Sequence, residues 1–174
     1  MMYGGTLRKD MKKPGIVIEI PGLGRREIKT IVGDYTGTHS QGGRLAPGVR
    51  RRLLKLARLV DIHILSADSF GTAREQLKGL PLEVHILKGE RHDVQKKEFG
   101  ERHEPRYVAA FGNGNNDRLL LRTVKEAGGI AIAVDNGEGC AIDALLQADL
   151  FIVGAARALD LLLEKTRCKA TLRF

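Results

Sequence analysis

Short apolar runs alternate along the chain with amphipathic helical patterns, and this alternation limits the fold more than any other feature. DIHILS at 61–66, RYVAAFG at 106–112 and GIAIAVD at 129–135 have the length and composition of buried strands. Between them, stretches such as DRLLLRTVKEA at 117–127 repeat apolar residues at helical spacing. The rhythm predicts an α/β fold, a three-layer Rossmann-like domain with a parallel sheet at its centre.

The start of the chain has a different pattern. IVIEI at 16–20 and EIKTIVG at 27–33 flank a PGLG turn signal, which predicts an opening β-hairpin whose second arm runs into the core. The length of 174 residues fits a single domain spanning 1–174. Only roughly 30 residues separate Asp34 from Ser66, and again Ser66 from Lys96, so we expect no large cap domain and an open site with 39–47 as a candidate flap.

The net charge of +8 favours an anionic partner. No aromatic-interleaved basic motif accompanies it, so nucleic acid is not the expected partner. Two cysteines without paired spacing favour a reducing cytoplasm. Residues 1–13 lack an apolar signal core and no apolar run approaches the roughly 20 residues of a membrane span, so we expect a soluble cytoplasmic protein without membrane contact.

Polar residues follow several of the predicted strands. Because parallel strands end at one edge of the sheet, Asp34, Ser66 and Asp117 are expected to lie together there. A carboxylate at this edge can attack phosphorus, a hydroxyl can bind a phosphoryl oxygen, and a lysine of DVQKKEF at 93–99 can neutralise both. Asp34 and Asp117 could share a Mg²⁺ ion. In the simpler interpretation Asp34 caps a turn, Asp117 caps a helix and the lysines are solvated.

These residues carry a resemblance to a known family. DYTGT at 34–38, Ser66 after a strand, a mid-chain lysine and GNGNND at 112–117 resemble the four ordered motifs of the haloacid dehalogenase superfamily. DYTGT and GNGNND are similar to the DKTGT and GDGxND motifs of P-type ATPases. The chain is most similar to the soluble P-type ATPase-like phosphatases, from the opening hairpin to the end.

The resemblance implies a haloacid dehalogenase-like fold and a Mg²⁺-dependent phosphatase that forms a phospho-aspartyl intermediate on Asp34. By resemblance, Lys96 is preferred to Lys97 because the QK step at 95–96 fits the family pattern better. The implied catalytic residues are Asp34, Thr36, Ser66 and Lys96; the implied metal ligands are Asp34, the Thr36 carbonyl and Asp117; the implied phosphate-binding residues are Gly37, Thr38, Ala67 and Asn116.

Three positions depart from the family patterns. Thr36 stands where many superfamily phosphatases carry an aspartate that acts as general acid and base. Asn113 replaces the first aspartate of GDGxND. Tyr35 replaces the lysine of DKTGT in the P-type ATPases, which are ion pumps. Thr36 and Asn113 favour an alternative function, a non-catalytic binding or regulatory module that retains the fold. A phospho-accepting receiver domain fits less well, because residues 1–13 lack its adjacent acids.

The partner is expected to be a phosphorylated substrate. Uncapped members of the superfamily tend to act on large substrates or to use a neighbouring subunit as a lid, which leaves a macromolecular substrate and a homo-oligomer open.

The histidines lie apart from these motifs. His63 and His85 occupy matching places in DIHIL and EVHIL and are predicted to face one another across the sheet. The sequence favours packing or hydrogen bonding over a metal pair, because no further ligand is evident. His39, His92 and His103 are predicted to be loop or surface residues, with His39 a candidate to assist substrate binding.

Overall fold

The computed structural model describes residues 13–68 and 71–174, which leaves the expected absence of a signal segment at 1–12 outside the described residues. Six parallel strands form the central sheet in the order β10-β9-β8-β3-β6-β7. The predicted parallel α/β sheet is therefore confirmed. Its strands are β3 (Thr30–Asp34), β6 (Asp61–Ser66), β7 (Glu83–Ile86), β8 (Val108–Gly112), β9 (Ile130–Asp135) and β10 (Leu150–Val153).

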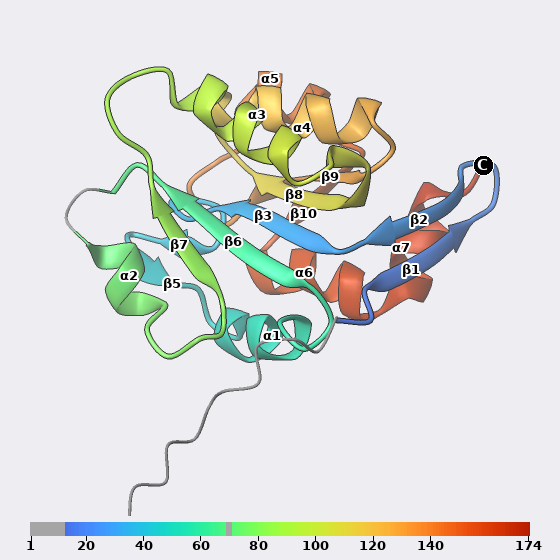
Figure 1. Cartoon of the computed structure of the whole chain (residues 1–174), viewed down its shortest axis with the longest axis horizontal. Coiled ribbons are helices and arrows are strands. Elements are labelled where there is room, and N and C mark those ends of the chain that lie inside the picture. Colours follow the sequence, from blue (N-terminus) through green and yellow to red (C-terminus); the bar gives the residue numbers. More distant parts are fainter. Residues whose placement is uncertain (1–12, 69–70) are drawn as a thin grey trace, which may run out of the picture.

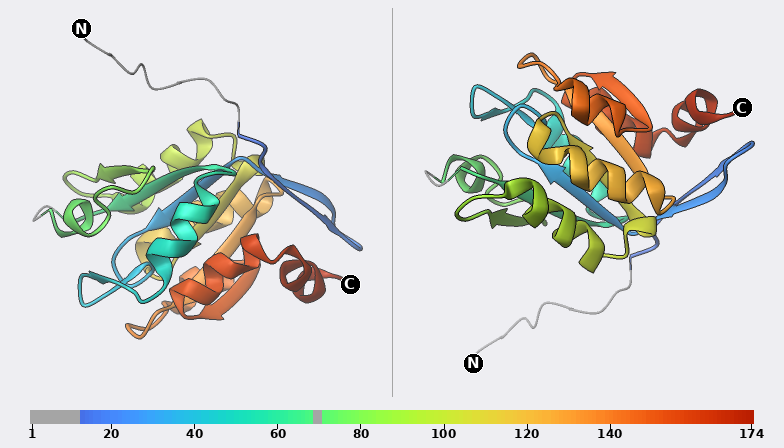
Figure 2. Two further views of the ribbon diagram at one scale, coloured as in Figure 1. Left: turned by 90° about the horizontal axis from the view of Figure 1, so that it is seen from below. Right: turned by 90° about the horizontal axis from the view of Figure 1, so that it is seen from above.

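Helices cover both faces of this sheet. Figure 1 shows α3 (His92–Arg102), α4 (Arg118–Glu126) and α5 (Ile142–Leu146) above it, with α1 (Val49–Leu56) and α6 (Ala155–Leu163) below, and Figure 2 shows the two helical layers from either side. Neighbouring residues of β3 serve opposite layers: Ile31 packs in the core under α1 and α6, and Val32 in the core under α3 and α4. A strand buried on both faces needs the continuous apolar run that the sequence has there.

The direction in which strands are added reverses at β3. From β3 the chain adds β6 and β7 on one side, then crosses back to add β8, β9 and β10 on the other. The loops that follow β3 and β8 therefore diverge from one point at the carboxyl edge, which is the usual ligand position in open parallel sheets. The two loops hold DYTGT and GNGNND.

The opening hairpin is present, but its predicted second arm is wrong in extent. β1 (Ile16–Ile20) pairs antiparallel with β2 (Gly24–Ile28), and β3 begins at Thr30 as a strand of the other sheet. The chain passes from the hairpin to the main sheet at Lys29. The Lys29 N–H donates to the Tyr107 carbonyl, and the Lys29 carbonyl accepts from the Asp61 N–H. The hairpin projects beyond the main sheet and packs along α7 (Lys165–Leu172) (Figure 1).

The candidate flap at 39–47 forms a small hairpin of β4 (Ser40–Gln41) and β5 (Arg44–Leu45). Hydrogen bonds from different parts of the chain hold it. Among them, the Tyr35 hydroxyl donates to the Gly43 carbonyl at 2.8 Å, the Leu45 N–H to Gln76 Oε1 at 3.2 Å, and Asn136 Nδ2 to the Ser40 carbonyl at 3.2 Å. The buried Tyr35 ring thus has a structural role in place of the pump's lysine.

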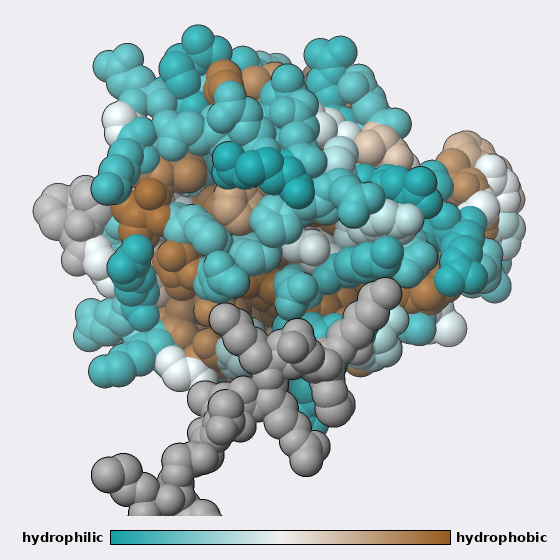
Figure 3. Space-filling view, in the orientation of Figure 1, coloured by the Kyte–Doolittle hydropathy of each residue, from teal (hydrophilic) through white to brown (hydrophobic). Residues whose placement is uncertain are grey.

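The remaining elements are short. They are α2 (Thr72–Gln76) and the 3-10 helices η1 (Pro105–Tyr107) and η2 (Asn115–Asp117). Within 13–68 and 71–174 the connections that follow β3 and β6 hold nothing larger than α1, so no large cap covers the carboxyl edge. None of the helices described has both the length and the apolar character needed to span a bilayer. The face seen in Figure 3 is mostly hydrophilic, with hydrophobic side chains visible between the polar ones.

Candidate active site

Asp34 is the last residue of β3, and the protein fixes its position through the backbone on both sides. The Tyr35 N–H donates to the Leu65 carbonyl of β6 at 3.1 Å, and His39 Nδ1 lies 2.6 Å from the Asp34 carbonyl oxygen. The side chain is 7% exposed, and the Thr38 hydroxyl lies 3.4 Å from its Oδ2. A rigid, almost fully buried carboxylate thus ends the central strand.

Lys96 joins Asp34 to Asp117. Its ammonium, wholly buried on the inner face of α3, donates to Oδ1 of Asp34 and to Oδ1 of Asp117, each at 2.6 Å. The neighbouring Lys97 points outward, is 42% exposed and pairs with Glu101 at 3.4 Å. One residue along a helix turns a side chain by about 100°, so only one of the two lysines can face the sheet.

The second carboxylate oxygen of Asp117, which does not bind Lys96, is held by backbone hydrogen bonds. This oxygen, Oδ2, accepts the N–H groups of Asn113 and Gly114, both at 2.9 Å, so the side chain points back over the GNGNND loop and makes no capping hydrogen bond to α4. A Cβ on Gly112 would come within 2.4 Å of the Asp117 Cβ, which requires glycine at the end of β8. The loop sequence therefore shapes the site as well as supplying the carboxylate.

The charges of this cluster do not balance. Burial raises the pKa of Asp34 to about 7 against the opposing effect of Lys96, and the Asp117 carboxylate adds to the rise. For Lys96, burial disfavours the charge, but the Asp117 and Asp34 carboxylates outweigh it and the pKa of the ammonium is raised. Two buried carboxylates facing one ammonium leave an excess of negative charge that a further cation would offset.

The donor set fits Mg²⁺. Mg²⁺ prefers hard oxygen ligands and uses one or two protein carboxylates. The carboxylates of Asp34 and Asp117 are oxygen donors at that excess negative charge, and the Thr36 carbonyl, the third predicted donor, belongs to an exposed residue of the loop that follows Asp34.

Asn113 has a structural reason to be an amide. Its Oδ1 accepts from the Thr38 hydroxyl at 3.0 Å and its Nδ2 donates to the Gly139 carbonyl at 3.2 Å, so it links the loops after β3, β8 and β9. An aspartate could not make the second bond because a carboxylate has no donor. Gly37, with φ of +74°, passes so close that a Cβ there would be 2.5 Å from Asn113 Nδ2.

The other predicted site residues lie at the same edge, and their side chains make no described hydrogen bond to the Asp34 carboxylate. Ser66 is buried at the end of β6, and its Oγ accepts from the Asp68 N–H at 3.1 Å. Ala67 is exposed and Asn116 is half-buried in η2. Within 13–68 and 71–174, no hydrogen bond joins these three side chains to the Asp34 carboxylate.

His39 lies in the turn that follows Asp34, which agrees with the prediction of a loop or surface residue, but the His39 side chain is buried in this turn. Its ring is 1% exposed and packs on Phe111 at 5.8 Å between ring centroids. Burial lowers its pKa, so the neutral ring donates from Nδ1 to the Asp34 carbonyl. A Cβ on Gly33 would lie 2.4 Å from His39 Cε1. A glycine inside an apolar strand was the available signal, because it marks a close approach by another group.

No protein-family model matches the sequence. Solved structures of three 3-deoxy-D-manno-octulosonate 8-phosphate phosphatases are similar in fold. The one from Yersinia pestis is 17% identical with a TM-score of 0.59, over 91% of this chain and 95% of that one. The one from Moraxella catarrhalis, in complex with a magnesium ion, a phosphate ion and the sugar acid, is 16% identical with a TM-score of 0.60, over 82% and 90%. The cobalt-bound one from Haemophilus influenzae is 15% identical with a TM-score of 0.57, over 84% and 94%.

Solved structures of two putative hydrolases of the haloacid dehalogenase (HAD) superfamily, from Streptomyces avermitilis and Legionella pneumophila, are similar as well, so the chain has the fold of this superfamily, as its motifs predict. A curated relative comes from Methanocaldococcus jannaschii. The uncharacterized protein MJ0073 is 41% identical over 66 residues, which are 38% of this chain and 67% of that protein. The chain belongs to the same family as MJ0073.

Proposed function

We propose that the protein is a Mg²⁺-dependent phosphatase that acts through a phosphorylated Asp34. The observation that carries the proposal is the wholly buried Lys96 ammonium, which donates to the carboxylates of Asp34 and Asp117 at 2.6 Å each. Buried charges are costly, and such an arrangement at the carboxyl edge of a parallel sheet is typical of a catalytic site. The phosphatases of similar fold support the same chemistry.

The reaction has two displacements at phosphorus. A carboxylate oxygen of Asp34 attacks the phosphoryl group, the bond from phosphorus to the leaving oxygen breaks, and that oxygen takes a proton from water. Water then attacks the same phosphorus, the bond to the Asp34 oxygen breaks, a proton returns to solvent, and inorganic phosphate leaves.

The residues of the chain have distinct roles in this scheme. The Lys96 ammonium orients the Asp34 carboxylate and offsets charge on the phosphoryl group. The loop and strand ends around Asp34 supply the phosphoryl oxygen contacts, and these residues are Gly37, Thr38, Ser66, Ala67 and Asn116. Asp34, Asp117 and the Thr36 carbonyl would hold Mg²⁺, which when bound offsets negative charge on the transferring group.

The substrate class follows from the surroundings of the site. A hollow of about 360 Å³ beside Asn116 is lined by Arg91 and Arg118, with Asp93 paired to both at 3.5 and 3.3 Å, and the excess of one positive charge suits a phosphorylated molecule. The similar structures are named for a phosphorylated sugar acid, which supports a small substrate. The open edge also admits a larger one. The free thiols of Cys140 and Cys168 suit a reducing compartment, which supports a cytoplasmic location.

The non-catalytic alternative loses part of the support that it takes from Asn113. Asn113 is explained by the two hydrogen bonds of its side chain, so it no longer argues against metal binding. Thr36 still lacks a titratable group, which predicts slow breakdown of the intermediate rather than loss of the first displacement.

The experiment measures phosphate release from acetyl phosphate and p-nitrophenyl phosphate, with Mg²⁺ and with a chelator. We expect activity only with Mg²⁺, and acid-quenched protein should carry an acyl phosphate on Asp34 detectable by mass spectrometry. Asp34→Asn should remove both the label and the release. Phosphate release by the asparagine variant at the parent rate, or full activity in chelator, contradicts the proposal.

A further inference from the structure

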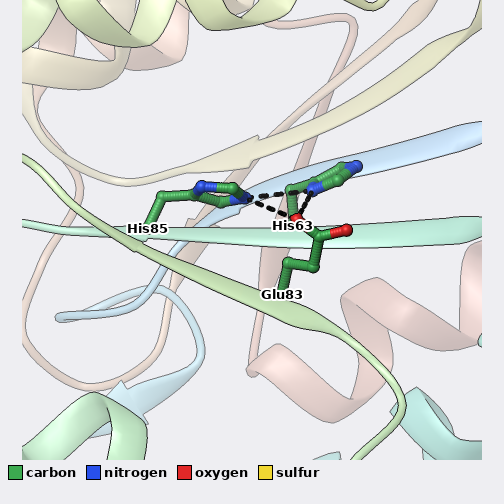
Figure 4. Close-up of side chains that lie close together, drawn as sticks. All are labelled: His63, Glu83 and His85. Carbon is green, nitrogen blue, oxygen red and sulfur yellow. Dashed lines mark hydrogen bonds and ion pairs between the residues drawn. The ribbon is translucent and has the colours of Figure 1, made fainter.

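Three metal-binding side chains meet on the outer strands of the sheet, away from the motifs discussed so far. His63 lies in β6, and Glu83 and His85 lie in β7, the edge strand. In the parallel register His63 is opposite Glu83 and Leu65 is opposite His85, so all three side chains point to one face. Figure 4 shows the two imidazoles and the carboxylate turned toward one another.

We propose that His63, Glu83 and His85 form a binding site for a divalent transition-metal ion of the zinc class. The proposal goes beyond the phosphatase function and does not depend on it. The sequence predicted that the two histidines face one another, and favoured packing because a third ligand was not evident. The structure supplies that third ligand, because Glu83 lies opposite His63 in the register and two residues before His85 on the same strand.

The distances between the ligand atoms are those of a metal site. His63 Nδ1 lies 3.1 Å from His85 Nε2, and Glu83 Oε2 lies 3.9 Å from the first nitrogen and 3.6 Å from the second. A point equidistant from the three atoms is about 2.1 Å from each, which matches zinc–nitrogen and zinc–oxygen bond lengths. An ion therefore fits without movement of the strands.

The chemistry of the three donors is also suitable. Two imidazoles and a carboxylate form a known type of zinc ligand set that leaves one position open. A metal ion binds the neutral form of each imidazole through a ring nitrogen. The hard oxygen donors at Asp34 and Asp117 favour Mg²⁺ instead, so the two sites differ in metal class.

The surroundings hold the imidazoles and leave a path from solvent. Phe99 of α3 packs against His63 and His85, with centroid distances of 5.3 and 4.7 Å, which fixes the ring planes. His63 is 8% exposed, whereas the Glu83 side chain is 69% exposed. His103 packs on His63 at 4.5 Å between ring centroids, and it is half-buried in the turn after α3, which agrees with the loop or surface position predicted from sequence. An ion can enter past Glu83 and reach the histidines from β7, at the front of Figure 1.

The test is calorimetric titration of the full chain with Zn²⁺ at pH 7.5, in excess Mg²⁺ so that the carboxylates at the other site are occupied. We expect one equivalent of zinc bound with micromolar affinity or better. His85→Asn should remove that equivalent, and Glu83→Gln should weaken it about tenfold or more. His92→Asn is the matched control: it also removes one histidine, but one outside the cluster, and should bind zinc as the parent does.

A second readout guards against variants that do not fold. Glu83 is largely exposed, so Glu83→Gln should keep the parent's melting temperature without metal while losing part of the zinc-induced rise. Cobalt should add a visible absorption band typical of nitrogen ligands in the parent, and the band should be lost in His85→Asn. The proposal is overturned if the parent takes up no zinc, or if His85→Asn and Glu83→Gln bind it as the parent does.

Discussion

The carboxyl edge of the sheet and its outer β6–β7 strands each gather three ionisable groups, but by different means. At the carboxyl edge, Asp34 ends a strand and Asp117 belongs to the loop after another, so the fold brings them together whatever the detailed register. At the outer strands, His63 and Glu83 lie inside strands and meet only because the register pairs them. Motif order thus specifies the first group, and pairing between strands specifies the second.

The largest expected effect separates the two adjacent lysines of α3. Lys96→Met should lower phosphate release at least about 10³-fold and lower the free energy of unfolding by about 3–5 kcal/mol, because it leaves two buried carboxylates without their cation. Lys97→Met, its matched control, should change both by little, since that side chain is exposed. Phosphate-release assays and urea unfolding measure the two effects in both variants. Equal losses of activity and stability in Lys96→Met and Lys97→Met would contradict the proposed site.

The next effect concerns Thr36, where the chemistry lacks an acid and base. With a good leaving group the parent should show a burst of product, followed by slow turnover limited by hydrolysis of the acyl phosphate. Thr36→Asp should speed that hydrolysis about 10²-fold and abolish the burst, because a titratable group can now deprotonate the attacking water. Stopped-flow measurement of both phases is the test, with Thr36→Asn as the isosteric control. A burst of unchanged size in the aspartate variant would refute this role.

A smaller effect tests whether Asp34 costs stability. Its pKa is about 7 in the folded protein against 3.8 as a free group, so between these values the folded state binds a proton that the unfolded state does not. Stability therefore falls as the pH rises from about 4 to 7. In chelator, Asp34→Asn should melt about 3–6 °C above the parent at pH 8 and about equal to it at pH 4. A constant difference across that range would contradict the raised pKa.

The smallest effect tests the amide of Asn113. Asn113→Asp removes the donor to the Gly139 carbonyl and adds charge near Asp117, so it should cost about 1 kcal/mol of stability in chelator. With Mg²⁺ the cost should shrink, because the added carboxylate lies beside the proposed metal ligands. Asn113→Ser, which keeps a hydroxyl donor, is the control. Thermal melts with and without Mg²⁺ measure both effects. If Asn113→Asp is more stable than the parent in chelator, the structural role of the Asn113 amide is contradicted.

The parallel sheet and the positions of its strand ends were predictable, because each depends on periodicity within one stretch of chain. The end of the hairpin was not predictable, because EIKTIVG at 27–33 has the pattern of one continuous strand. What divides it is a change of hydrogen-bond partner at Lys29, to Tyr107 and Asp61, which are far away in sequence.

The positions of several side chains around the candidate site were also not predictable, because they depend on contacts between residues far apart in sequence. The QK step selects Lys96 by resemblance only, while the helix orientation that buries it depends on packing against the sheet. The burial of His39 also comes from tertiary packing, since its ring lies against Gly33 and Phe111. Glu83 has no signal of its own, because its place beside two histidines exists only once β6 and β7 are aligned.

One helix serves both regions. α3 carries Lys96 into the carboxylate cluster, and three residues later Phe99 packs on the two imidazoles of the outer strands. Residues three apart lie on neighbouring parts of one helical face, so α3 cannot leave one region without leaving the other. The amides of α3 should therefore exchange with deuterium as a single cooperative unit, and an ion bound by β6 and β7 would slow their exchange as far as Lys96.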